Sequence, residues 1–326
     1  MTKKTFKPID TTGVKTYSIK GRTSKVSADD LASLPKKGGT VSEFFDSLPN
    51  ILGAETLKNV IDAIVLAHKN GHTVAIGMGA HVIKTGMSPI IIDLMERGVI
   101  NSVSMNGAGI VHDFELAFAG FTSEDVDSVI GEGEFGMAEE TGRMLNEAIK
   151  AGASNDIGLG RAVGNMINGD APEGLPEDYD AEFKNKHLSI LAAGARLDIP
   201  VTVHVALGTD IPHVHSSMDG AATGKCTEID FRTVTSVVAS LKDGVFVNIG
   251  SAVIMPEIFI KALTLARNLG HDVKNITAVN MDFIQHYRPV TNIVKRPTLG
   301  SGKGYTLTGH HEIMVPLLYA GIIENL

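Results

Sequence analysis

The sequence of 326 residues contains no tryptophan and a single cysteine, Cys226. One cysteine excludes a disulfide within the chain. No apolar run approaches the ~18 residues that a membrane helix needs, and the start MTKKTFKPID lacks the apolar stretch of a secretory signal. We therefore expect a soluble protein in the reducing cytoplasm, without a membrane partner.

Positive charge is also in short supply. Lysine and arginine number 29 against 37 acidic residues, which gives a formal net charge of −8. The basic residues are scattered and do not alternate with aromatic residues, so the sequence offers no basic surface that would follow a phosphate backbone. We expect no nucleic-acid partner. The residue types in excess are glycine, with 35, and histidine, with 12.

The chain changes character near residue 40. Residues 1–40 are rich in Thr, Lys, Ser and Gly, which predicts an amino-terminal arm, whereas 41–326 reads as one domain. There, short apolar runs alternate with amphipathic segments. We expect strands at 72–76, 100–104, 201–206, 245–249 and 275–279, helices at 54–69, 88–97, 138–150, 186–197, 227–241, 256–269 and after His310, and a surface loop at 168–180. This alternation predicts an α/β fold with a parallel sheet covered on both faces.

Glycines follow the first two predicted strands, in Gly77-Met78-Gly79-Ala80-His81 and Met105-Asn106-Gly107-Ala108-Gly109. Small residues at strand ends let the backbone approach the phosphates of a ligand, but they also occur in plain tight turns. The first turn lacks the third glycine of GxGxxG, and the second strand ends in Asn106 instead of an acid for a ribose hydroxyl. The standard dinucleotide fingerprint is therefore absent, and both interpretations stay open. The run 300–304 (GSGKG) lacks the Walker pattern and is not a phosphate loop.

Histidines cluster near predicted strand and helix ends, at His204, at His213 and His215, and in the sequence His310-His311-Glu312. In an extended segment His213 and His215 would share one face, which suits metal ligation as well as acid–base catalysis. Histidines on the surface or hydrogen-bonded in the core are the alternative. No further motif supplies a ligand set, so we assign no metal.

The roles of two aspartates are not determined by the sequence. Asp113 is either a site residue or an acid that complements the amino terminus of its own helix, and Asp219 is most simply a turn residue.

Several segments resemble the deoxyhypusine synthase family. They are 79–86 (GAHVIKTG), 93–98 (DLMERG), and 106–109 (NGAG) followed by His112 and Asp113, while 220–224, 250–253, Asn280 and 316–318 fall where that family has later glycine-rich and packing segments. The resemblance runs from about residue 50 to the end. It implies one Rossmann-like, doubly wound domain, a homotetramer, and NAD bound across the strand ends.

The same resemblance implies cofactor contacts and a reaction. The NAD contacts map onto His81, Thr85, Asn106, Gly107, Ala108, Gly250, Ser251, Gly309 and His310, and onto either Asp210 or Asp219. Members of the family oxidise an amine carbon of spermidine with NAD and pass the aminobutyl imine through an enzyme lysine to an acceptor amine. Such chemistry needs a hydride acceptor, a base and a nucleophilic lysine.

The sequence departs from the family pattern at the reacting groups. The Ser-Trp-Gly-Lys motif is missing with its tryptophan, and the lysine position falls on Pro297 or, if one loop is shortened, on Lys303. The histidine of the family falls near 255–257, where there is none, and Val111 or His112 replaces an expected acid. In exchange, the chain has His213, His215, His286, His310, His311 and Glu312. We therefore predict a bacterial-type paralogue with a rebuilt site.

Three functional hypotheses follow. The first is an NAD-dependent enzyme that acts on a polyamine or another amino compound and is not an authentic deoxyhypusine synthase. The second is a hydrolase or lyase with a histidine and acid site, with or without a metal, on the same scaffold. The third is a nucleotide-binding protein without activity. The candidate catalytic residues are Lys303, His213, His215, His311, Glu312 and Asp113.

Overall fold

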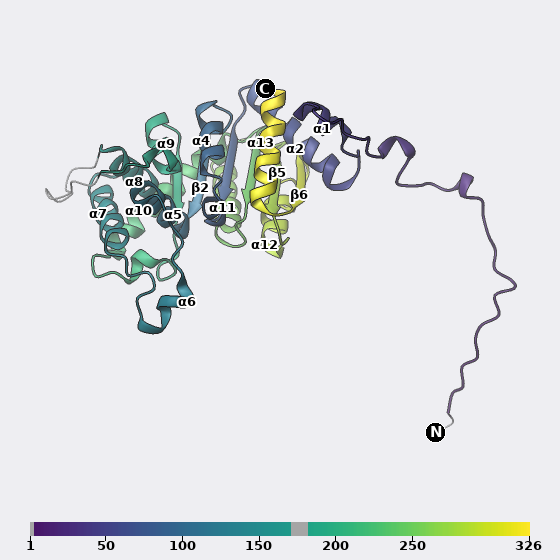
Figure 1. The fold of residues 1–326 in the computed structure, drawn as a ribbon, viewed down its shortest axis with the longest axis horizontal. Coiled ribbons are helices and arrows are strands. Elements are labelled where there is room, and N and C mark those ends of the chain that lie inside the picture. Colours follow the sequence, from purple (N-terminus) through teal and green to yellow (C-terminus); the bar gives the residue numbers. More distant parts are fainter. Residues whose placement is uncertain (1–2, 171–181) are drawn as a thin grey trace.

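The computed structural model describes residues 3–170 and 182–326, and a six-stranded parallel sheet runs through it (Figure 1). Its strands are β1 (Val74–Met78), β2 (Ser102–Asn106), β3 (Val201–His204), β4 (Val245–Ile249), β5 (Thr277–Asp282) and β6 (Lys303–Thr308). They lie in the order β3-β2-β1-β4-β5-β6, and every neighbouring pair is parallel. This is the strand order of the dinucleotide-binding α/β folds, in which the winding direction reverses between β1 and β4. The predicted doubly wound parallel sheet is confirmed.

Five strands lie within about three residues of their predicted positions. The sixth, β6, was not predicted. Five of its six residues are exposed or half-buried, because β6 is an edge strand that pairs with β5 alone. The sequence KGYTLT therefore carries no apolar run.

The helices cover both faces of this sheet. They are α1 (Val41–Ser47), α2 (Leu52–Lys69), α3 (His81–Lys84), α4 (Ser88–Glu96), α5 (Gly107–Ala119), α6 (Val126–Val129), α7 (Glu139–Ser154), α8 (Leu159–Asn168), α9 (Ile190–Leu197), α10 (Gly220–Ala239), α11 (Ile254–Asn268), α12 (Tyr287–Pro289) and α13 (His311–Asn325). A short 3-10 helix, η5 (Ile211–Val214), follows β3. The predicted loop at 168–180 lies from residue 171 onward outside the described residues.

Alternate residues of the central strands β1, β4 and β5 enter two separate cores. On β1, Ile76 belongs to the core that contains side chains of α2, α4 and α13. Its neighbour Ala75 belongs to the core of the opposite face, with Phe259 of α11 and Val238 of α10. Buried apolar area of this kind is the main stabilising contribution to such a domain. A sheet buried on both faces also explains why its strands read as continuous apolar runs.

The single thiol lies deep in the larger core. Cys226 of α10 has no exposed surface, and its Sγ donates to the carbonyl oxygen of Ile149 at 3.3 Å. Burial, with a smaller contribution from Asp230, raises the pKa of this thiol to about 11. Cys226 is therefore a packing residue that stays protonated.

Residues 3–40 extend away from the sheet (Figure 1) and are exposed except for the half-buried Asp30. Two backbone hydrogen bonds join the end of this segment to the region around α1: the Ser33 N–H donates to Ser47, and the Asn50 N–H to Asp30. The division at residue 40 remains a prediction. Among the described residues, no helix combines the length and apolarity required to span a bilayer.

Candidate functional site

The carboxyl ends of the parallel strands bring two groups of polar side chains to one edge of the sheet. The Asp210 cluster lies beyond β2 and β3 and consists of Asn106, Gly107, Thr209, Asp210 and His213. The His311 cluster lies beyond β1 and β5 and consists of His81, Asp282, Phe283, His310 and His311. Ligands of open α/β sheets bind at this edge, next to the point where the winding reverses.

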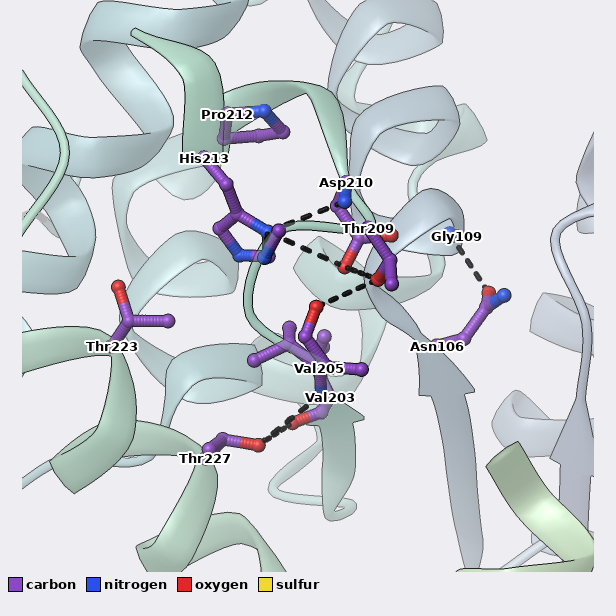
Figure 2. A network of polar contacts seen from close by, with 12 residues as sticks. Asn106, Gly109, Val203, Val205, Thr209, Asp210, Pro212, His213, Thr223 and Thr227 are labelled. Atoms are coloured by element: carbon purple, nitrogen blue, oxygen red, sulfur yellow. Dashed lines mark hydrogen bonds and ion pairs between the residues drawn. The ribbon is translucent and has the colours of Figure 1, made fainter. Parts of the chain in front are cut away.

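Asn106 ends β2 and starts α5. Its Oδ1 accepts the N–H of Gly109 at 3.1 Å, so the amide side chain caps one free donor of the helix (Figure 2). Asparagine at this position therefore has a structural reason that does not require a ligand.

The carboxylate of Asp210 reaches over the first residue of α5. A Cβ built on Gly107 would lie 2.0 Å from Oδ2 of Asp210, so only glycine permits this approach. The Asp210 side chain is 10% exposed, and burial raises its pKa while the neighbouring His213 opposes that effect. An acidic side chain thus lies beside the end of β2, although it comes from the loop after the adjacent strand, β3.

His213 faces this aspartate. Its Nδ1 accepts the backbone N–H groups of Gly208 and Asp210, each at 3.2 Å, and lies 4.0 Å from Oδ2 of Asp210 (Figure 2). Because Nδ1 accepts, the proton of the neutral imidazole resides on Nε2. His213 therefore holds the loop that carries Asp210.

His215 lies elsewhere. Its Nε2 is 3.2 Å from the carbonyl oxygen of Gly136, and a Cβ on Gly142 of α7 would meet its ring at 2.1 Å. The expectation that His213 and His215 share one face is wrong, because residues 211–214 form the 3-10 helix η5 with Pro212 in its first turn instead of an extended segment. One imidazole faces the loop after β3 and the other packs on α7.

A cavity of about 230 Å³ opens beside the Asp210 cluster. Its apolar lining is Ala108, Val111, Val126, Phe135 and Ile211, and its polar lining is Lys84, His112, Glu115, Ser123, Glu124, Thr209 and Asp210. Burial and the charge of Lys84 lower the pKa of His112 to about 4, so this imidazole is neutral at physiological pH. Glu115 is held by the hydroxyl groups of Thr122 and Thr141, at 2.5 and 3.1 Å.

At the reversal point the ends of β1 and β4 touch. The Gly79 N–H donates to Ile249 at 2.9 Å, and a Cβ on Gly79 would lie 2.2 Å from the carbonyl oxygen of Gly250. Gly250 has a φ of +64°, and a Cβ there would lie 2.5 Å from Cε1 of His311. Ser251 is buried, and its hydroxyl accepts the Met255 N–H at 3.2 Å. These glycines are needed for close packing of the strand ends against each other and against the His311 cluster.

The His311 cluster contains a row of three polar side chains. Nδ1 of His81 and Nδ1 of His311 are 2.9 Å apart, and Nε2 of His311 is 3.6 Å from Oδ1 of Asp282. His311 has no exposed surface, Asp282 is 4% exposed, and His81 is exposed. The ring of Phe283 lies between 5.9 and 6.2 Å from the rings of His81, His310 and His311. One exposed imidazole is thus connected to a buried carboxylate.

Asp113 of α5 contacts the start of another helix, α9. It is fully buried and accepts hydrogen bonds from the Ser189 hydroxyl and from the N–H groups of Ile190 at 2.7 Å and Leu191 at 3.2 Å. Asp113 therefore closes the amino terminus of α9, a different helix from its own. Burial raises its pKa to about 6, against the effect of these three hydrogen bonds.

Asp219 caps α10. Its Oδ1 accepts the N–H groups of Ala221 and Ala222 at 2.9 and 3.0 Å, and its side chain is exposed. Of the two aspartates that compete for a cofactor contact, the structure brings Asp210 to the strand ends and gives Asp219 a capping role.

Lys303 lies at the amino ends of the strands, opposite the two clusters. It begins β6, pairs with Thr277 at the start of β5, and faces a polar hollow lined by Asn59 and Asp62 among others. The structure does not bring it near the two clusters, because a parallel strand places its first and last residues at opposite edges.

The remaining candidates lie around the His311 cluster. His310 and Glu312 are exposed, with Nδ1 and Oε1 3.8 Å apart. Thr85 follows α3 and donates its hydroxyl to the carbonyl oxygen of His81 at 2.9 Å. The Gly309 N–H donates to the carbonyl oxygen of Asp282 at 3.3 Å.

Asp282 and Phe283 were missed by the sequence reasoning. The predicted strand ended at residue 279, whereas β5 continues to Asp282, and both Asn280 and Asp282 are buried. A polar residue directly before the aromatic Phe283, at the end of an apolar run, is a signal that could have extended the strand.

No group of three or more His, Cys, Asp or Glu side chains in residues 3–170 and 182–326 could hold a metal ion.

Comparison with known proteins gives no match to a family model and no match to a curated protein. Among solved structures, the ternary complex of AgrE with ornithine and NAD+ aligns with a TM-score of 0.52 and 14% identity, over 84% of this chain and 34% of AgrE. Unliganded AgrE gives 0.51 with the same identity and coverage. The chain therefore corresponds to about a third of AgrE in length. The similarity shows a shared fold.

A protein provisionally assigned as a deoxyhypusine synthase, from Entamoeba histolytica, aligns over 88% of this chain and 94% of its own, with 15% identity and a TM-score of 0.49.

Proposed function

We propose that this chain is a cytoplasmic, NAD-dependent enzyme that oxidises a polyamine or another small amino compound. The observation that carries the proposal is the contact between Asp210 and Gly107, at the end of β2 and one strand away from the reversal point. In dinucleotide-binding sheets an acid beside the second strand binds the ribose hydroxyl groups. The position of Asp210 supports this role, although the sequence at the end of β2 has no acid.

The residues around the strand ends fit a dinucleotide. Asn106 and Asp210 would hold the adenosine ribose, and the adjoining cavity has the apolar walls that suit a base. Gly79, Gly250 and Ser251 leave the reversal point free of bulky side chains. The His311 cluster then lies on the β4 and β5 side, where the second half of a dinucleotide belongs. When bound, NAD would supply a hydride acceptor for the amine carbon.

The substrate class rests on two supports. AgrE, which shares the fold, has been solved with both NAD+ and ornithine. The sequence segments that resemble deoxyhypusine synthases point to an amine as well. The transfer step differs, because no lysine contacts His81, Asp282 or His311 among the described residues. We therefore propose that the imine passes directly to an acceptor amine or to water.

A second candidate function is hydrolytic or lyase chemistry on the same scaffold. The row from Asp282 through His311 to His81 favours it, since an exposed imidazole backed by a carboxylate can activate water without a cofactor. The two candidates differ in whether the nucleotide binds.

Titration calorimetry with NAD separates them. We expect the wild-type protein to bind NAD, Asp210→Asn to bind it about tenfold more weakly through loss of a charged acceptor, and Asp219→Asn to bind it like the wild type. Equal binding by all three proteins would remove Asp210 from the site. No binding by the wild type would leave the second candidate.

Two further measurements complete this test. NADH formation with a series of diamines and polyamines would identify the substrate. Native mass spectrometry would count the subunits, for which we propose four, and would detect nucleotide retained from expression.

A further inference from the structure

Three side chains of the His311 cluster come from separate parts of the chain and meet in a row. Asp282 ends β5, His311 is the first residue of α13, and His81 is the first residue of α3. The row runs from a buried carboxylate to an exposed imidazole, through contacts of 3.6 and 2.9 Å. His81 and His311 are 230 positions apart in sequence. No helix or turn requirement explains why two imidazoles should touch here.

The contacts determine where the protons lie. Nδ1 of His81 and Nδ1 of His311 share one hydrogen bond, so one of them carries the proton and the other accepts it. If His311 carried it, the bare lone pair of its Nε2 would face the carboxylate of Asp282 inside the protein, where such a repulsion is costly. His311 is therefore protonated on Nε2 and accepts at Nδ1. It follows that His81 is protonated on Nδ1, which leaves its Nε2 as a lone pair.

We propose that Asp282, His311 and His81 form a proton relay in which Nε2 of His81 is the general base of the site, while His311 and Asp282 are positioning residues. Nε2 of His81 makes no hydrogen bond to any described residue. Among histidines in general, the Nδ1–H form of neutral imidazole needs a partner to fix it, and here His311 is that partner.

The surroundings support this assignment. Burial lowers the pKa of His311, and the charge of Asp282 is the largest opposing effect, so His311 stays neutral, with its one proton on Nε2. Glu312 also acts on His311, and His310 stacks on Phe283. Asp282 is itself fixed, because its Oδ1 accepts the Phe283 N–H at 2.8 Å. The 3.6 Å contact is longer than a hydrogen bond, so Asp282 acts on His311 mainly through its charge.

The relay deepens the proposed function, and it rests on that function for the identity of the group that donates the proton. The ammonium group of an amino substrate transfers one proton to Nε2 of His81, which leaves a neutral amine whose lone pair the oxidation requires. His81 then carries a positive charge, which the Asp282 carboxylate stabilises through His311. The tautomers themselves are a property of the chain without any ligand.

The experiment is a two-bond ¹H–¹⁵N correlation spectrum of the full-length protein labelled with ¹⁵N-histidine, recorded at about pH 7.5. His81→Gln and His311→Gln assign the two signals. We expect His81 as the Nδ1–H form and His311 as the Nε2–H form. In Asp282→Ala the carboxylate that holds the proton on Nε2 of His311 is gone, so both histidines should lose their preference for a single tautomer.

Chemical reactivity gives an independent measurement. Diethyl pyrocarbonate attacks an unprotonated imidazole nitrogen, and mass spectrometry locates the product. We expect Asp282→Ala to slow the modification of His81 by about twofold or more, because the outer nitrogen is then protonated in part of the molecules. Asp243→Ala is the matched control: Asp243 accepts a hydrogen bond from Asn275 at the amino ends of the strands, and its loss should leave both readouts unchanged.

An Nε2–H form of His81 in the wild type would overturn the relay, as would unchanged tautomers in Asp282→Ala. Calorimetry with NAD on the same samples separates this result from the proposed function. Correct tautomers without NAD binding would keep the relay and refute the NAD enzyme. NAD binding with the opposite tautomers would keep the NAD enzyme and refute the relay.

Discussion

The carboxylate of Asp210 lies so close to Gly107 that a single methyl group cannot fit between them, since a Cβ on Gly107 would be 2.0 Å from Oδ2 and 2.4 Å from Cγ. We predict that Gly107→Ala folds, because a carboxylate at the end of a side chain can rotate away, but that it displaces Asp210. NAD affinity should fall about tenfold, as for loss of one charge-assisted hydrogen bond. Calorimetry measures it.

Gly224→Ala is the control for this substitution. Gly224 lies within α10 with open space around it, so an added methyl group should leave binding unchanged and increase helix stability slightly. If the effect of Gly107→Ala passes through Asp210, the double variant with Asp210→Asn should bind no more weakly than either single variant. Additive losses would contradict that explanation.

Lys303→Ala should have almost no effect. Lys303 is exposed at the amino ends of the strands, so we expect a change in unfolding free energy within about 0.5 kcal/mol and unchanged NAD binding and turnover. Urea denaturation and the NADH assay check both. A folded Lys303→Ala protein without turnover would restore this lysine as the nucleophile.

Asp113→Ala should destabilise the protein strongly. The substitution leaves the Ser189 hydroxyl and two N–H groups of α9 without their acceptor in the core, which costs about 3 kcal/mol. Asp219→Ala, at an exposed cap, should cost about 1 kcal/mol. Urea denaturation of the three proteins gives the comparison. A stable Asp113→Ala protein that has lost activity would show a catalytic role instead.

Acid should destabilise the fold through His204. This histidine is 2% exposed, bonds Thr202, and has a pKa lowered by burial to about 4, against 6.5 for an exposed imidazole. Between these values the unfolded chain binds the proton and the folded chain does not, so stability falls as the pH falls from 6.5 to 4. From pH 7 to 5 the loss is about 2 kcal/mol.

The matched measurement compares the wild type with His204→Gln at both pH values. All other titrating groups, His112 among them, are common to the two proteins and cancel in the difference. The wild type should lose about 2 kcal/mol more than the variant. Parallel pH profiles would show that His204 does not titrate in this range.

Local sequence patterns were sufficient for the sheet and its layers, because each inner strand buries both faces and so reads as an apolar run. They failed where burial is decided by a distant partner. Asn280 and Asp282 look like loop residues, yet the strand continues through them, since the Asn280 amide oxygen accepts from the buried Asn248 at 2.7 Å. The strand β6 was missed for the opposite reason, because it is an edge strand with polar faces and so has no apolar run.

The location of the site could be predicted from the sequence, but the residues that come together there could be predicted only in part. Glycines and histidines at strand ends indicated the correct edge of the sheet. Pairing them depends on contacts such as His81 with His311, or Asp210 with Gly107, which join positions far apart in sequence and leave no periodic trace. For His213 and His215, the assumption of an extended segment gave the wrong geometry because Pro212 starts a turn there.

The burial of Cys226 makes this protein convenient for spectroscopy. Its only native thiol is enclosed by the core and protonated, and maleimide reagents need an accessible thiolate. A cysteine introduced at an exposed position, such as Thr209 beside the cavity or Phe283 beside the histidines, would therefore take up a fluorophore or spin label selectively. Ligand binding beside the Asp210 cluster or the His311 cluster could then be followed in a chain that retains its natural cysteine.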